Sequence, residues 1–334
     1  MTISTQAPIH LTFVGGGHLA QAIISGILSS TNPWALKCNI AVTARRAEHV
    51  QELQSRYPQL LVTDNNLDKR IWQDARRSHR TSTQDSTTSP ILFICTRPAD
   101  VPTVSKQLAP TLESLDPSVR PTVVTMCPGI TVSQLQDWLP TGTAIVRSMP
   151  NTPVEVRQGA TGLFASEDAT VRVNHVKTVL EEVSPLVTIV PEESMLDVVA
   201  AVSGSGPAHF FFVIESMVAA AESMGLPREA AEPLVIQSCL GAGYLASASS
   251  KSVADLRKEV CVPGGSTEKA ISHLDQNGVQ TLFKVAIQKS LDANLKMQFS
   301  VHVWIKYDLE ARGGLLAQKG LDINQTAPGY NGVY

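Results

Sequence analysis

The stretch Asp197-Val-Val-Ala-Ala-Val-Ser-Gly-Ser-Gly-Pro-Ala-His-Phe-Phe-Phe212 separates two halves of the sequence with different hydrophobic patterns. Before it, short apolar runs alternate with helix-like segments, which predicts an α/β domain. After it, apolar residues recur at helical spacing, which predicts an all-α domain. Two glycines with unrestricted φ, followed by Pro207 at a position suited to the first turn of a helix, predict that one helix ends here and another begins. A helical corner without any chemistry explains this stretch equally well.

The composition of the 334 residues favours a globular protein without a nucleic-acid partner. Apolar residues make up 43% of the chain, and charged residues make up only 17%, against an average of about 25%. The low charge favours a buried subunit interface, with a surface rich in Ser and Thr as the alternative. A net charge of −3 without a basic stripe gives no electrostatic reason to expect nucleic acid.

The sequence predicts no membrane span, no secretory signal and no metal site. No apolar run reaches the length of a membrane span, and residues 1–10 lack the basic start and apolar core of a signal. We therefore expect a cytoplasmic protein that has no membrane partner. Its five cysteines are far apart and its histidines show no paired ligand spacing, which indicates free thiols without metal.

A dinucleotide-binding pattern lies near the start of the chain. The apolar run Leu11–Val14 leads directly into Gly15-x-Gly17-x-x-Ala20, after which apolar residues take helical spacing. Glycines at the first two positions allow the backbone to approach a pyrophosphate, and the start of the helix attracts its negative charge. We predict cofactor binding at Gly15 and Gly17, with a plain glycine turn as the alternative.

The next predicted strand, 39–44, ends in Arg45 and Arg46 where a chain that binds NAD usually places an acidic residue. Two guanidinium groups can instead hold the 2′-phosphate of NADPH by charge-assisted hydrogen bonds. The sequence therefore favours NADPH as the cofactor, with NADH as the second candidate. A pair of solvated arginines at the start of a helix is the alternative interpretation.

Further candidates for the cofactor site follow from the ends of later predicted strands. The runs 90–96 and 123–127 are typical of buried parallel strands, whose carboxyl ends face the ligand in an open α/β sheet. This places Thr96, Arg97, Cys127 and Pro128 at the site by position alone. Between strands, residues 65–90 are polar and predict a surface insertion.

A second anion site is predicted in the helical half. Residues 262–271 place two glycines and two hydroxyl residues immediately before a helix, so backbone N–H groups could hold an anionic group of a substrate. Capping of the helix by Ser266 or Thr267 is the alternative.

Together these segments resemble one family, the pyrroline-5-carboxylate reductases. The resemblance extends from about residue 10 to about residue 297 and rests on Phe13-Val-Gly-Gly-Gly-His-Leu-Ala-Gln-Ala-Ile23, Arg97-Pro98, Met149-Pro-Asn-Thr-Pro153, Leu196-Asp-Val-Val-Ala-Ala-Val-Ser-Gly-Ser-Gly-Pro-Ala208, Gly225-Leu-Pro-Arg228 and Val262-Pro-Gly-Gly-Ser-Thr267.

The resemblance implies a Rossmann-type NADP-binding domain over 1–191, a helical dimerisation and substrate domain over 192–299, and a tail of unknown structure over 300–334. It also implies a homodimer or higher homo-oligomer that reduces a small cyclic imine to proline. Thr267 would hydrogen-bond the imine nitrogen, and Gly264 and Gly265 would hold the substrate carboxylate beside Ser266 and Val260. The implied cofactor-binding residues are Gly15, Gly17, His18, Leu19, Arg45, Arg46, Asn65, Thr96, Arg97, Pro98, Cys127 and Asn151.

Departures from the family pattern leave the substrate open between plain 1-pyrroline-5-carboxylate and a substituted pyrroline-carboxylate. The family usually has Asn at His18, Lys at Arg97, Ala at Cys127 and a small hydroxyl residue at Val262. A β-hydroxyacid dehydrogenase is disfavoured because 241–246 lacks the lysine of that class, and retention of Thr267 beside both glycines disfavours a scaffold without activity. Residues 301–306 match nothing in the family, and an added edge strand, a disordered tail or sequence from a misread gene end are the alternatives.

Overall fold

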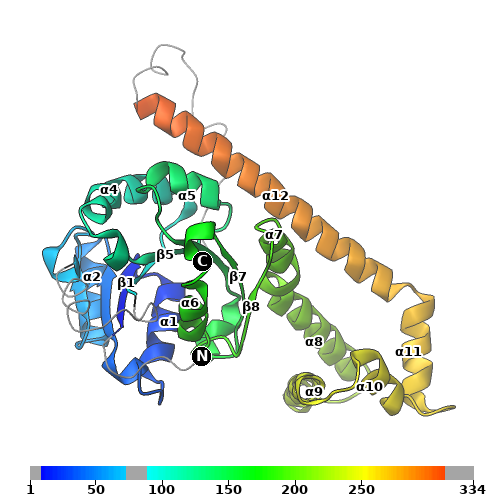
Figure 1. Cartoon of the computed structure of the whole chain (residues 1–334). Coiled ribbons are helices and arrows are strands. Elements are labelled where there is room, and N and C mark those ends of the chain that lie inside the picture. Colours follow the sequence, from blue (N-terminus) through cyan, green and yellow to red (C-terminus); the bar gives the residue numbers. More distant parts are fainter. Residues whose placement is uncertain (1–8, 73–88, 313–334) are drawn as a thin grey trace. The chain divides into compact units, whose positions relative to one another are not determined.

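The computed structural model describes residues 9–72 and 89–312, with side chains up to residue 296. The chain divides into two compact units. Residues up to Gly204, together with those from Asp292 onward, belong to the sheet unit, and Ser205–Leu291 form the helical unit. Both are drawn in Figure 1, and each is described by itself.

An eight-stranded, mostly parallel sheet forms the centre of the sheet unit. Its order is β3-β2-β1-β4-β5-β6-β7-β8, and β7 and β8 run antiparallel to the other six strands. The first six strands reproduce the Rossmann order, so the predicted fold class is confirmed. The strands are β1 His10–Val14, β2 Asn39–Thr43, β3 Leu61–Thr63, β4 Ile91–Ile94, β5 Thr122–Thr125, β6 Ile145–Met149, β7 Ala160–Ala165 and β8 Leu186–Ile189.

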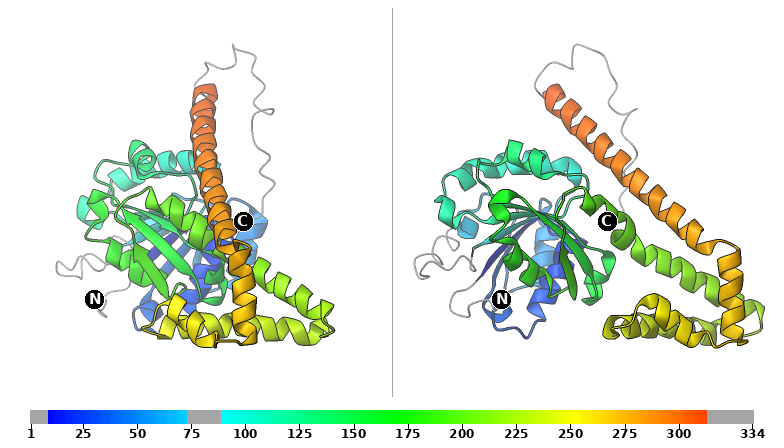
Figure 2. Two further views of the ribbon diagram at one scale, coloured as in Figure 1. Left: turned by 90° about the vertical axis from the view of Figure 1, so that its right-hand side faces the viewer. Right: turned by 45° about the vertical axis from the view of Figure 1, so that its right-hand side comes forward.

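Helices cover both faces of this sheet (Figures 1 and 2). On one face lie α1 His18–Leu28, α2 Ala47–Arg56 and α6 Val173–Leu180, and on the other lie α4 Val101–Glu113 and α5 Val132–Trp138. The short 3-10 helices are η1 Ala35–Lys37, η3 Pro98–Asp100, η4 Pro117–Val119, η5 Thr152–Val156 and η6 Glu167–Ala169.

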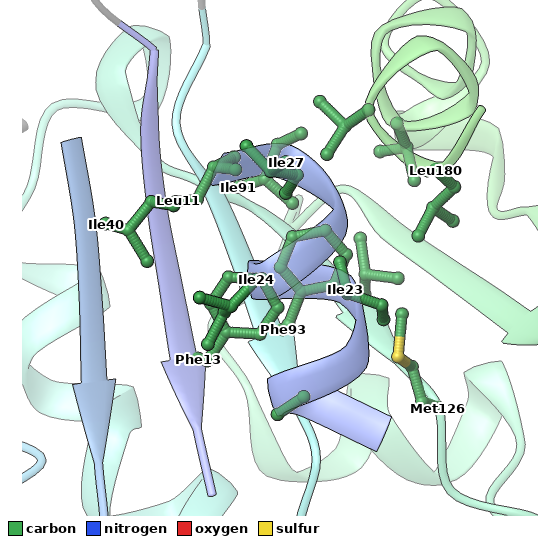
Figure 3. Packing of buried hydrophobic residues seen from close by; sticks show 14 of the residues in the cluster. Leu11, Phe13, Ile23, Ile24, Ile27, Ile40, Ile91, Phe93, Met126 and Leu180 are labelled. Carbon is green, nitrogen blue, oxygen red and sulfur yellow. The ribbon is translucent and has the colours of Figure 1, made fainter. Parts of the chain in front are cut away.

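The core on the α1 face fixes how β1 and β4 meet. Phe13 of β1 and Phe93 of β4 stack with ring centroids 4.7 Å apart and an interplanar angle of 12°. Ile23, Ile24 and Ile27 of α1 are fully or almost fully buried in the same cluster (Figure 3). Aromatic stacking and apolar burial of this kind supply most of the stabilisation of such a core.

Within Asp197–Phe212 one helix ends and another begins, as the sequence predicted, although the last turn of the first helix is π-helical. Helix α7, Met195–Val199, continues through a π-helical turn at Ala200–Gly204, and α8, Gly206–Ser223, begins after Ser205. The glycines take no positive φ here. Pro207 stands in the first turn of α8, where its missing N–H leaves no hydrogen bond unmade. The remaining helices are α9 Arg228–Ala248, α10 Val253–Val260, α11 Ser266–Gln276 and α12 Val279–Arg312.

Two other sequence interpretations need correction. The polar insertion starts later than residue 65, because Ile71 and Trp72 are buried in the core on the α4 face and Trp72 Nε1 donates to the Asn66 carbonyl at 3.2 Å. Residues 301–306 are part of α12 and form no edge strand. Residues 73–88 of the insertion and 313–334 of the tail lie outside the described residues.

The helical unit exposes most of its apolar side chains. Between residues 205 and 291, all of which the structure describes, Val218 and Ala231 are the only buried hydrophobic residues. Phe210, Phe211 and Phe212 of α8 are each more than 60% exposed. By length and mean hydropathy alone, the helical stretch Met195–Ser223 is long and apolar enough to cross a membrane, which corrects the expectation that no run reaches that length. Exposed apolar side chains in this number indicate a covering partner.

His175 predicts a measurable pH dependence of folding. It is buried in α6, its Nε2 has no hydrogen-bond partner among the described residues, and burial lowers its pKa from 6.5 to about 4. As the pH falls from 6.5 to 4, the unfolded chain takes up a proton that the folded chain does not, so stability falls. The loss from this group should reach about 3 kcal/mol near pH 4.

Urea unfolding at pH 7 and pH 4.5 measures this loss. The free energy of unfolding should drop less between these pH values in His175→Gln than in the exposed control His273→Gln. Equal drops in both variants would contradict the assignment.

Candidate active site

The carboxyl ends of six parallel strands meet at one edge of the sheet. Strands β2 and β3 extend to one side of β1, and β4, β5 and β6 to the other. The strand order therefore reverses between β1 and β4, and a ligand of an open α/β sheet binds in the crevice at this reversal. The predicted cofactor residues that follow β1, β2, β4 and β5 are brought to this edge.

Three small residues after β1 have three separate structural roles. Gly15 has φ +103°, and a Cβ there would lie 2.6 Å from the Cys95 carbonyl oxygen. Gly17 precedes α1, and a Cβ there would have no atom within 4 Å. Ala20 is fully buried. In this order, the three residues allow the tight turn, the open approach for pyrophosphate and the close helix packing of a dinucleotide site.

The start of α1 suits an anion. Gly17 is its N-cap, no side chain caps it, and the first turn holds no acidic residue. His18 is exposed and Leu19 half-buried at this first turn. Backbone N–H groups and the positive end of the helix are therefore directed at the open space beside Gly17. The residues present fit the pyrophosphate of NAD(P)H.

Gln21 holds the glycine loop in place, a role that was not predicted from the sequence. Its side chain is buried, its Nε2 donates to the Gly16 carbonyl at 2.9 Å, and its Oε1 accepts from Arg56 at 2.9 Å. The only sequence signal is a polar residue at a core position of an otherwise apolar helix face. Gln21 thus connects the loop to α2 through Arg56.

The two arginines after β2 differ in their surroundings. Arg46 is the exposed N-cap of α2. Arg45 is exposed as well, but its guanidinium forms an ion pair with Asp100, whose carboxylate lies 3.1 Å away. Asp100 also pairs with Arg97 at 3.1 Å. Asp100 was not predicted, because nothing local in the sequence connects it to a residue 55 positions earlier.

The predicted cofactor residues at the ends of β4 and β5 lie in different environments. They are Thr96, Pro98 and Cys127. The Thr96 hydroxyl is buried and has no partner among the described residues, and Pro98 begins η3 half-buried. Cys127 is buried, and its thiol donates to the Thr96 carbonyl at 3.1 Å. Burial raises the pKa of the Cys127 thiol to about 12, and the Asp100 carboxylate contributes. The Cys127 side chain is therefore turned inward, which leaves only its backbone for a cofactor.

Asn65 and Asn151 use their side chains within the protein. Asn65 Oδ1 accepts from Leu67 N at 2.9 Å in the turn after β3. Asn151, which follows β6, accepts from Ala160 N at 2.8 Å and donates to the Ser203 carbonyl at 3.3 Å. Asn151 thus connects the loop after β6 to β7 and to the π-helical turn. Both predicted contacts with a cofactor stay predictions.

The loop before α11 has the shape of an anion site, but the backbone N–H groups of its two glycines are already hydrogen-bonded within the chain. Gly264 has φ +75°, and a Cβ on Gly265 would lie 2.8 Å from the Val262 side chain. Gly265 N donates to the Val262 carbonyl at 2.9 Å, and Gly264 N donates to Glu268 Oε2 at 2.7 Å. A carboxylate of the chain itself therefore occupies the Gly264 N–H group.

The other predicted substrate residues surround this loop in the helical unit. Val260 is the last residue of α10 and is exposed, Ser266 is the first residue of α11, and Thr267 follows half-buried. The structure thus gathers the predicted substrate residues in one loop and most of the predicted cofactor residues at one sheet edge. Each group lies within its own unit.

Comparison with known proteins assigns the chain to a family. Residues 193–297 match the family of pyrroline-5-carboxylate reductase dimerisation domains. A Delta-1-pyrroline-5-carboxylate reductase of Gibberella fujikuroi is 41% identical over 287 residues, which cover 86% of this chain and 95% of the relative. The enzyme of Corynebacterium melassecola is 32% identical over 285 residues, which cover 84% and 96%.

Solved structures of pyrroline-5-carboxylate reductases are also similar to this chain. The pyrroline-5-carboxylate reductase of Coxiella burnetii superposes with a TM-score of 0.71 at 31% identity and covers 86% of this chain and 97% of its own. The Plasmodium falciparum pyrroline carboxylate reductase with NADP bound has a TM-score of 0.66 at 21% identity, covering 87% and 100%, and shows the same fold.

The glycine loop of the sheet unit and the sequence identity with the curated relatives together show that the protein is an NAD(P)H-dependent oxidoreductase. It belongs to the pyrroline-5-carboxylate reductase family. The domain boundary stays a prediction: the sequence placed it at 191/192, the matched domain begins at 193, and the compact units divide after Gly204.

Proposed function

We propose that the protein reduces the C=N bond of 1-pyrroline-5-carboxylate to give L-proline, with NADPH as the preferred cofactor. The observation that carries the proposal is the loop Val262–Thr267, in which the N–H group of a left-handed glycine, Gly264, already binds a carboxylate oxygen of Glu268 at the start of a helix that also carries the Thr267 hydroxyl. Bound NADPH supplies the hydride. The loop holds the carboxylate, and Thr267 donates to the ring nitrogen as it becomes basic.

A substituted pyrroline-carboxylate is the second candidate substrate. Val262 favours it, because its side chain is exposed beside Gly265 and presents an apolar surface where the family usually has a small hydroxyl residue. An apolar wall accommodates an alkyl group on the ring better than a polar one does, and it offers no hydrogen bond to the plain ring.

The helical unit supports a homodimer as the working assembly. Residues 193–297 match a dimerisation domain, and the apolar residues of α8 lie exposed in the single chain. A second copy that covers Phe210, Phe211 and Phe212 would remove three large side chains from water, a gain of about 1.5–3 kcal/mol for each.

Steady-state oxidation of NADPH by the full-length protein tests the reaction. The assay compares 1-pyrroline-5-carboxylate with a methyl-substituted analogue at matched concentrations. A higher kcat/KM with the plain ring supports the primary proposal, and a higher kcat/KM with the methylated ring transfers the assignment to the second candidate. Absence of turnover with both rings would refute the proposed function.

Thr267 is expected to act in the chemical step. Thr267→Ala removes the donor to the ring nitrogen while Ser266 remains to begin α11, so kcat should fall by about 10²-fold or more and the Kd of NADPH should not change. The matched control is Thr281→Ala in α12, which should retain wild-type kcat. Wild-type kcat in Thr267→Ala would remove the hydroxyl from the mechanism.

Glu268 is expected to compete with the substrate. Its carboxylate holds the Gly264 N–H group, so a bound carboxylate must displace it against like-charge repulsion. Glu268→Gln leaves a neutral, weaker acceptor, and KM for 1-pyrroline-5-carboxylate should fall about 5-fold with kcat retained. Asp275→Asn removes the same charge from the far end of α11 and should leave KM unchanged. An unchanged or raised KM in Glu268→Gln would mean that Glu268 only shapes the loop.

A further inference from the structure

An acidic side chain stands between two arginines beside the glycine loop. Asp100 Oδ2 lies 3.1 Å from Arg45 Nη2 and 3.1 Å from Arg97 Nε, and Asp100 Oδ1 accepts from Arg45 Nη1 at 3.3 Å. Arg45 follows β2, whereas Arg97 and Asp100 follow β4. Because β1 lies between these strands, the ion pair between Arg45 and Asp100 crosses from one side of the glycine loop to the other, whereas Arg97 and Asp100 lie on the same side.

Asp100 is the fixed member of this group. Its side chain is 23% exposed, whereas those of Arg45 and Arg97 are 71% and 75% exposed. Arg45 contacts Asp100 through both terminal nitrogens, and this paired arrangement is also the one by which arginine grips a phosphate. The part of Arg45 that suits a 2′-phosphate is thus already bound to a carboxylate.

We infer that Asp100 is a specificity-determining residue for the cofactor, which weakens the advantage of NADPH over NADH by occupying Arg45. A 2′-phosphate carries about two negative charges and has to separate Arg45 from Asp100 or lie beside a like charge. The 2′-hydroxyl of NADH carries no charge and can donate a hydrogen bond to a carboxylate. Arg46, which follows Arg45 directly, remains to contact the phosphate.

Direct binding tests the inference without any substrate, so the result does not depend on the proposed reaction. Fluorescence titration gives the Kd of NADPH and of NADH for the full-length wild type and for Asp100→Asn. The asparagine retains the size of Asp100 but loses the charge. We expect the Kd of NADPH to fall about 5-fold, the scale of one exposed ion pair, and the Kd of NADH to stay the same or rise.

A matched variant controls for net charge. Glu181→Gln removes one carboxylate that pairs with Lys177 on α6, outside the predicted site, and should leave both Kd values unchanged. An unchanged ratio of the two Kd values in Asp100→Asn would overturn the inference. A ratio that shifts toward NADH would overturn it as well, because Asp100 would then position Arg45 for the phosphate.

A double-mutant cycle identifies the route by which Asp100 acts. In an Arg45→Ala background, Asp100→Asn should change the Kd of NADPH by less than 2-fold, because the partner through which Asp100 acts is absent. The full 5-fold gain in that background would show a direct repulsion of the cofactor and would overturn the role assigned to Arg45. Thermal unfolding of each variant checks that the fold is retained.

Discussion

The contact between Gly15 and the backbone of Cys95 is the constraint on which the cofactor edge depends. A Cβ at Gly15 would lie 2.6 Å from the Cys95 carbonyl oxygen and 2.8 Å from its carbon, and neither backbone atom can move aside. The chain can therefore turn immediately after β1 only with glycine at this position, at a φ that other residues rarely adopt. This turn places the start of α1 over the reversal of strand order, and the burial of Ile23 and Ile24 then fixes the helix axis.

Two of the three predicted anion sites, the 2′-phosphate site and the loop before α11, hold a carboxylate of the chain itself. Asp100 pairs with Arg45 beside the glycine loop, and Glu268 accepts from Gly264 before α11. The Arg45 guanidinium and the Gly264 N–H group are exposed to water, so each internal contact stabilises the free protein only slightly. Ligand binding then becomes an exchange of one anion for another, and affinity depends on the difference between the two. The same arrangement that preserves the site in the free chain also limits how tightly it binds.

Local patterns in the sequence predicted the glycine loop, the strand ends and the helix starts, because each depends on residues within a few positions of one another. The missed features connect distant residues. Asp100 meets Arg45, Gln21 meets Arg56, and Asn151 meets Ser203. The π-helical turn at Ala200–Gly204 was also missed, because the glycines predict that a helix ends here but not how its last turn is wound. Gly204 packs closely against Met149, a residue of β6 far away in the sequence.

The exposed apolar surface of the helical unit includes most of the apolar helical stretch Met195–Ser223. A helix long and apolar enough for a membrane and a helix buried between subunits have the same composition, so length and hydropathy cannot distinguish them. The match of residues 193–297 to a dimerisation domain distinguishes them. It favours a second copy of the chain, with an apolar centre and a polar rim, as the cover for this surface.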